Sequence, residues 1–111
     1  MGAPPAETGR FTVLSVDQPL LEAHVAVVRS EIEEAIAAKR TRLVLDLAHA
    51  SFIDSSGLEL LLETARRLRG MGGRLKVVNP NPLCSEILTA TRLDRELEIA
   101  FDLHQAGRSL K

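Results

Sequence analysis

The segment from Leu43 to Leu47 constrains the fold more than any other part of the chain, because four of its five residues are aliphatic. A short apolar run of this kind is typical of a strand that is buried within a sheet. Apolar residues then recur at helical spacing at Leu58, Leu61, Leu62, Ala65 and Leu68. The two patterns predict a strand, a polar turn and a helix, with the turn at the positive end of the helix dipole, where anions are favoured.

The rest of the chain continues the alternation of strands and helices. Strands are expected at 11–16, 43–47, 74–79 and 96–101, and helices at 19–36, 56–69 and 83–91, with a further short helix within 103–111. Pro19 is expected to open the first helix, and Gly70 to cap the second. This alternation predicts an α/β fold with a mostly parallel sheet and right-handed crossovers. Since there are few elements, the helices are expected to cover mainly one face.

Composition limits the chain to a small number of protein classes. A chain of 111 residues fits one domain, which we place at 11–111, after a Gly- and Pro-containing stretch at 1–10 that is expected to be a flexible tail. The absence of Trp and Tyr and the net charge of −1 argue against nucleic acid as a partner. Cys84 is the only cysteine, and neither a signal core nor a membrane-spanning run is visible, so a cytoplasmic location is expected.

The polar turn holds two adjacent serines. Ser56 is followed three residues later by Glu59, which is the pattern of a capping box and predicts that the Ser56 hydroxyl is occupied as the helix N-cap. Ser55 would then carry the free hydroxyl. Gly57 is expected to leave open the approach of another protein to that hydroxyl. Local chemistry therefore favours Ser55 as the phosphoacceptor.

The turn and its flanking strands resemble those of the STAS domain. The resemblance rests on 43–47, on 51–58 with its Asp54-Ser55-Ser56-Gly57 element, and on 72–79, and it extends over 21–101. It implies a small mostly parallel or mixed sheet of four to five strands packed with helices mainly on one face. It also implies an anti-sigma-factor antagonist, in which Ser55 is phosphorylated by a partner anti-sigma factor that is a serine kinase of the histidine-kinase-like ATPase fold. A serine phosphatase is a possible second partner, and no cofactor is implied.

The chain departs from the antagonist pattern near its start. Such proteins usually carry two early strands and a Gly-x-Leu-Asp element before the first helix, whereas here Leu21-Glu22 stands at about that place without the glycine. Glu22 is therefore the expected acidic neighbour of the phosphosite. The surface expected to bind a partner comprises Glu22, His24, Ser51, Phe52, Ile53, Leu58 and Leu62, together with the phosphosite residues Asp54, Ser56 and Gly57.

Other functions find less support in the residues. A serine hydrolase would need a base near Ser55 and usually a G-x-S-x-G elbow, but no such elbow is present, and His49 has no evident orienting partner. No catalytic residue and no metal ligand is expected, because the histidines are far apart. Cys84 is interpreted as a small core residue, although its place at a helix start could lower its thiol pKa. A basic stretch, Arg66-Arg67-x-Arg69, is explained by the helix dipole and by a pair between Glu63 and Arg67.

Two functions without catalysis remain. In the first, the unphosphorylated protein binds the anti-sigma kinase, and phosphorylation of Ser55 releases it. In the second, the domain is a permanent adaptor of a lipid-transport ABC system or a signalling assembly, in which Ser55 need never be phosphorylated. The retained Asp-Ser-Ser-Gly element favours the first, while the unusual N-terminal segment keeps the second open.

Overall fold

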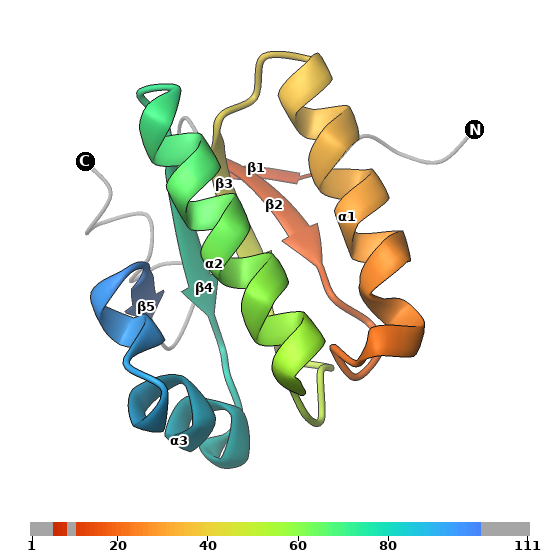
Figure 1. Cartoon of the computed structure of the whole chain (residues 1–111). Coiled ribbons are helices and arrows are strands. Elements are labelled where there is room, and N and C mark those ends of the chain that lie inside the picture. The colour runs from red at the N-terminus through yellow and green to blue at the C-terminus, as the bar shows by residue number, and fades with distance from the viewer. Residues whose placement is uncertain (1–5, 9–10, 101–111) are drawn as a thin grey trace.

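The computed structural model describes residues 6–8 and 11–100, and it confirms the predicted alternation of strands and helices (Figure 1). In chain order the elements are β1 (Ala6–Thr8), β2 (Phe11–Ser15), α1 (Glu22–Ala37), β3 (Arg42–Asp46), α2 (Ser55–Gly70), β4 (Arg74–Val78), α3 (Pro82–Ala90), the 3₁₀ helix η1 (Leu93–Arg95) and β5 (Glu98–Ala100). The last strand begins at Glu98 rather than Glu96, because the amides of Glu96 and Leu97 both donate back to Leu93 O at the end of η1. The helix expected within 103–111 lies outside the described residues.

The five strands form one sheet in the order in which they occur in the chain. β2, β3, β4 and β5 are parallel neighbours, and β1 pairs antiparallel with β2 at the sheet edge. Each parallel pair is joined through a helix, as parallel pairing requires. The tail prediction is wrong for Ala6–Thr8, because these residues pair with Phe11–Val13 along the free edge of β2. The rest of the segment 1–10 lies outside the described residues.

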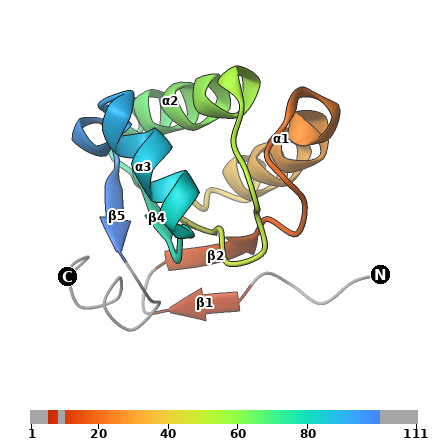
Figure 2. The same ribbon diagram turned by 90° about the horizontal axis from the view of Figure 1, so that it is seen from below.

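Among the described residues, the helices α1, α2 and α3 pack on one face of the sheet (Figure 2), as predicted. The core between them is almost wholly aliphatic. It is built from Leu43 and Leu45 of the central strand β3 and from Leu47 just after it, with Leu60, Leu61 and Leu68 of α2 packed over them. From α1 it receives Val28, Ile32 and Ala35. Leu43 and Leu45 of β3 thus point toward the helices, and Val44 between them points to the other face of the sheet.

Two helix ends differ from their predicted positions. α1 begins at Glu22 rather than Pro19, because Leu20 is held in an extended bridge to Ile53 and Leu21 has extended dihedral angles. α2 includes Gly70 and is capped at its carboxyl end by Met71, and the left-handed residue that turns the chain is Gly72, with φ of 77°. Gly72 therefore takes the role at the carboxyl end of α2 that the sequence predicted for Gly70.

Candidate functional site

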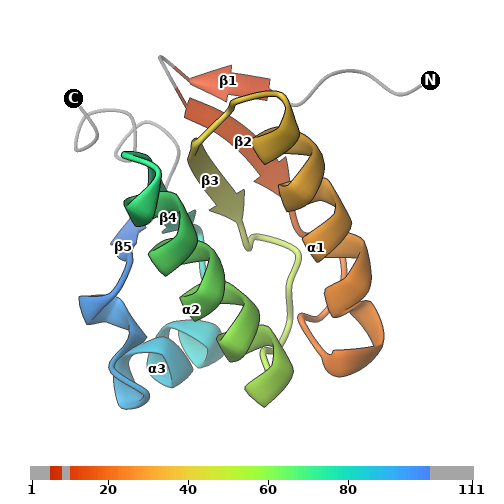
Figure 3. The same cartoon turned by 45° about the horizontal axis from the view of Figure 1, so that its top comes forward.

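The loops before α1 and α2 meet at the edge of the sheet where the parallel strands end. Figure 3 shows the amino ends of both helices at this end of the molecule. Leu20 and Ile53 form a parallel bridge between the loops, in which the Leu20 amide donates to Phe52 O over 2.8 Å and the Asp54 amide donates to Leu20 O over 3.2 Å. Both side chains are buried. The bridge therefore sets the position of one helix start relative to the other.

Asp54 joins the two helix starts through its carboxylate. Oδ1 accepts from the Gly57 amide over 3.0 Å, which makes Asp54 the N-cap of α2, and Oδ2 accepts from the Glu22 amide over 3.0 Å at the first residue of α1. These amide donors, that of Glu22 first and that of Gly57 next, hold the pKa of the Asp54 carboxyl below its ordinary value. The side chain is thus ionised near neutral pH and fixed in place.

The predicted capping box is wrong. α2 begins at Ser55, so the cap is Asp54, and Ser56 lies inside the first turn. A carboxylate at Asp54 can satisfy amides of both helices, which the shorter Ser56 hydroxyl at its position in the turn does not do. The preference for Ser55 over Ser56 therefore cannot rest on capping.

Exposure distinguishes the two serines instead. Ser55, the first residue of α2, is exposed, whereas Ser56 is half-buried and lines a groove against α1. Within the described part of the chain no hydrogen bond is formed by the Ser55 hydroxyl. An incoming active site therefore meets Ser55 first, and its phosphorylation stays a prediction.

Gly57 has a different role from the one expected. It is buried, and a Cβ at this position would lie 2.3 Å from Leu20 O and 2.9 Å from both Ile53 Cγ2 and Leu20 Cγ. Glycine is required here because the first turn of α2 packs directly against the backbone of the α1 loop. Gly57 thus supports the bridge between the loops and has no part in access to Ser55.

The residues expected to bind a partner divide into exposed and buried sets. Glu22, Ser51 and Phe52 are exposed around the two helix starts, and His24 is half-buried in the first turn of α1. Leu58 and Leu62 are also half-buried and pack against the core. Ile53 is 1% exposed, so its assignment to the contact surface is wrong: its side chain belongs to the core.

A groove of about 560 Å³ runs between α1 and α2 from the phosphosite. It is lined by Glu22, Val25, Ala26, Arg29, Ser30, Glu33, Ser56 and Glu59. Two ion pairs link the helices farther along, one between Arg29 and Glu63 over 3.0 Å and one between Arg67 and Glu33. The pair predicted between Glu63 and Arg67 is therefore wrong, because each of these side chains finds a closer partner on α1.

Asn81 anchors the other side of the phosphosite loop and was missed in the sequence. Its Nδ2 donates to Ser51 O over 3.2 Å and to Ala50 O over 3.4 Å, and its Oδ1 accepts from the Cys84 amide over 2.7 Å as the N-cap of α3. An Asn followed by Pro is a recognised helix-start signal, but nothing local reveals its contact with residues 30 positions earlier. With Asp54, it holds the loop between α1 and α3.

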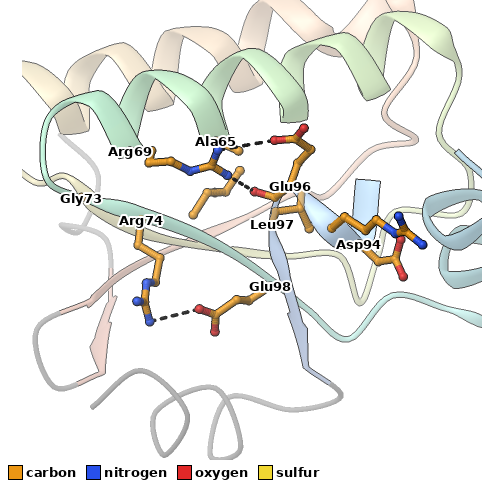
Figure 4. A pocket seen from close by; sticks show the side chains of 10 residues that line it. Ala65, Arg69, Gly73, Arg74, Asp94, Glu96, Leu97 and Glu98 are labelled. Carbon is orange, nitrogen blue, oxygen red and sulfur yellow. Dashed lines mark hydrogen bonds and ion pairs between the residues drawn. The ribbon is translucent and has the colours of Figure 1, made fainter. Parts of the chain in front are cut away.

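A second pocket, of about 370 Å³, lies at the opposite end of α2 (Figure 4). Arg69 donates to Glu96 O over 2.7 Å, and Arg74 pairs with Glu98 over 3.0 Å. Arg66 also contacts the Glu96 carboxylate, at 3.4 Å. Arg66 and Arg69 of the basic stretch thus share the Glu96 carboxylate as an ion-pair partner, in addition to the favourable helix dipole predicted from the sequence.

Cys84, metal binding and membrane spanning are the remaining points raised by the sequence. Cys84 is buried, with Sγ 3.4 Å from Ala50 O, and burial raises the pKa of its thiol. This confirms the core interpretation. Across residues 6–8 and 11–100, no set of three or more His, Cys, Asp or Glu side chains could hold a metal ion. In the same part of the chain no helix is both long and apolar enough to cross a membrane.

Comparison with known proteins identifies the domain. The family model of the STAS domain matches residues 4–106. A candidate anti-sigma factor antagonist from Thermotoga maritima superposes with a TM-score of 0.88 at 20% identity, covering 96% of this chain and 92% of that one. At this identity the likeness shows the fold.

Two further structures share this fold. The anti-sigma factor antagonist SpoIIAA of Bacillus, in its unphosphorylated form, matches with a TM-score of 0.68 at 25% identity, covering 95% of this chain and 93% of that one, and SpoIIAA has also been solved phosphorylated. A chain of the stressosome, a signal integration and transduction hub, matches with a TM-score of 0.68 at 19% identity over 96% of this chain and 97% of its own.

Proposed function

Because this chain belongs to the STAS domain family, we propose that it is an anti-sigma-factor antagonist that acts by partner switching. Unphosphorylated, it binds an anti-sigma factor that is itself a serine kinase, which frees a sigma factor. Phosphorylation of Ser55 ends that binding, and a serine phosphatase restores it. The protein acts by binding and needs no cofactor, and we place it in the cytoplasm.

The observation that carries this proposal is the position of Ser55. Its side chain is exposed at the first residue of α2, directly after Asp54, whose carboxylate binds the amino ends of both α1 and α2. Asn81 holds the preceding loop from the side of α3. The Ser55 hydroxyl is thus exposed at the end of a loop that hydrogen bonds hold in one position, which suits a site that another protein must recognise and modify.

The charge at this site explains how phosphate would weaken binding. A phosphoserine carries about −1.5 to −2 charges near neutral pH. Asp54 is ionised and held by backbone amides, so it cannot turn away, and the carboxylates of Glu22 and Glu59 belong to the adjoining groove. The new charge adds repulsion and bulk to the contact surface, while the positive end of the α2 dipole offsets part of its effect on folding. Binding is therefore expected to weaken while the fold is kept.

The contact surface that follows from this geometry is smaller than the one expected from sequence. Glu22, Ser51, Ser55 and Phe52 form its exposed part. Phe52 is 41% exposed, and a large apolar side chain at the centre of a patch is a common anchor of protein interfaces. Leu58 and Leu62 contribute only their exposed edges.

The proposal is tested by mass spectrometry of the protein recovered from its own cells, before and after phosphatase treatment. We expect a phosphate on the peptide that contains Ser55, lost in Ser55→Ala and kept in Ser56→Ala. Ser55→Ala should retain the kinase in pull-down experiments, and Ser55→Asp should release it with an unchanged circular dichroism spectrum. Phosphate lost in Ser56→Ala but kept in Ser55→Ala would show that Ser56, and not Ser55, is the acceptor.

A permanent adaptor is the second candidate, and the observation that favours it is Val27. This side chain is 62% exposed on α1, away from the core stripe, and could serve a constant contact in a lipid-transport ABC system or a signalling assembly. The likeness to a stressosome chain supports such a role. Unmodified protein that co-purifies stably with an ATPase or an assembly, and that no longer does so as Val27→Asp, would favour the adaptor over the switch.

A further inference from the structure

The backbone of Phe52 is held on both sides, although its side chain is 41% exposed. The peptide group before it is held from the start of α3, because Asn81 Nδ2 donates to Ser51 O over 3.2 Å. The peptide group after it is held from the loop before α1, because the Leu20 amide donates to Phe52 O over 2.8 Å. Since peptide groups are planar, the two hydrogen bonds restrict φ and ψ of Phe52, and with them the direction of its side chain.

The hold on the first of these peptide groups depends on one side chain. The preceding residue, Ala50, is 1% exposed, and its carbonyl oxygen lies 3.4 Å from both Asn81 Nδ2 and Cys84 Sγ. Among the described residues, however, Ser51 O accepts from Asn81 alone, and the Phe52 amide donates to no other group. Without Asn81 the peptide group between Ser51 and Phe52 would therefore be free to turn.

We propose that Asn81 is a positioning residue for partner binding, which orients Phe52 before the partner arrives. The inference rests on the proposed function, in which Phe52 is the apolar anchor of the surface that binds the anti-sigma kinase. A side chain that is already oriented in the free protein loses less conformational freedom on binding, so affinity rises without a new contact. The place of Ser55 is set by the start of α2, which Asp54 caps. Asn81 therefore acts on affinity and leaves phosphoryl transfer to Ser55 unchanged.

Asn81 has two roles, and one substitution separates them. Its Oδ1 caps α3 by accepting from the Cys84 amide over 2.7 Å, whereas its Nδ2 donates to the loop. Asn81→Asp keeps an acceptor of similar quality at the cap, but an ionised carboxylate has no donor. Asn79→Gly is the matched control. It removes an asparagine amide from the same segment, whose partner is Asp46 over 3.2 Å, and glycine readily adopts the left-handed φ of 56° found there.

NMR relaxation of the free protein tests the positioning without a partner. We expect an order parameter of about 0.85 for the Phe52 amide in the wild type and in Asn79→Gly, and a fall toward about 0.6 in Asn81→Asp. Asn81→Ser, a second variant that keeps the cap, should show the same fall, because its single side-chain oxygen is occupied by the cap. An order parameter that stays at the wild-type value in both variants at position 81 would overturn the proposal.

The effect on affinity is measured with the kinase that the wild-type protein retains in pull-down experiments. Asn81→Asp should raise the Kd of the complex about twofold to tenfold, the range expected for one hydrogen bond, and leave kcat for phosphorylation unchanged. In the Phe52→Ala background the same substitution should add little, because both residues act on one contact. A lower kcat, or an equal loss of affinity in that background, would contradict the proposal. If the wild type retains no kinase, the proposed function fails, while the NMR result still decides whether Asn81 orients Phe52.

Discussion

Gly57→Ala tests whether the two helix starts are packed as closely as the structure shows. An alanine Cβ would lie 2.3 Å from Leu20 O, about 1 Å short of the 3.4 Å at which ordinary contact begins. The obstacle is backbone, held by the hydrogen bond from the Asp54 amide and by the bridge to Ile53. Relief therefore requires the α2 start and the α1 loop to separate.

The expected cost follows from three effects. Overpacking of a closely fitted site costs about 1–3 kcal/mol, and a weakened Asp54 to Leu20 hydrogen bond costs about 1 kcal/mol. Against this, alanine is favoured over glycine within a helix by about 1 kcal/mol. We expect a net destabilisation of about 1–3 kcal/mol, which for a chain of this size lowers the melting temperature by roughly 4 °C per kcal/mol.

Gly70→Ala is the matched control, because it is the same substitution in the same helix. No atom lies within 4 Å of the Cβ position at Gly70, so the variant should gain from a few tenths to about 1 kcal/mol. Urea unfolding of both variants shows whether the free energy of unfolding falls in Gly57→Ala and rises in Gly70→Ala. If Gly57→Ala were as stable as Gly70→Ala, the close approach of α2 to Leu20 would be refuted.

Three further predictions concern other parts of the molecule. Arg92→Gly should stabilise the protein by about 0.5–1 kcal/mol in urea unfolding, because Arg92 is left-handed with φ of 61°; an unchanged midpoint would contradict this. Asp54→Asn should be less stable than the wild type above pH 3.8. The difference should shrink as the pH falls through the lowered folded-state pKa of Asp54, because the wild type loses its carboxylate there. A difference in stability that does not change between about pH 2 and pH 7, the range in which carboxyl groups titrate, would refute the role of the carboxylate. Cys84 should react with a thiol reagent only slowly in the native protein and fully in urea, because burial both shields the thiol and raises its pKa; rapid native reaction would show that α3 opens.

The order of strands and helices could be read from the sequence because it depends on local patterns. The apolar run at Leu43–Leu47 and the helical spacing from Leu58 to Leu68 each specify one element. Their alternation then leaves a parallel sheet with crossover helices as the simple arrangement. β1 was missed because Ala6–Thr8 is three residues long and gains its strand conformation from pairing with β2.

The candidate site was predicted in place but not in detail. The sequence set Ser55 at the start of a helix that follows a strand, and that position is found. The cap was misassigned because Ser56 and Glu59 satisfy a local pattern, whereas Asp54 gains a second amide, that of Glu22, from a segment 32 residues away. A local pattern cannot reveal such a competitor.

The sequence by itself thus determined the family resemblance and the class of fold, and it placed two candidate serines at the start of a helix that follows a strand. The tertiary structure alone decided what Asp54, Gly57 and Asn81 do, and which of the two serines is exposed. Their roles depend on contacts between loops that are about 30 residues apart in the chain, and such contacts arise only when α1, α2 and α3 are packed on the same face of the sheet. Periodicity records which side of an element is buried, but the atoms that it meets there are fixed by packing.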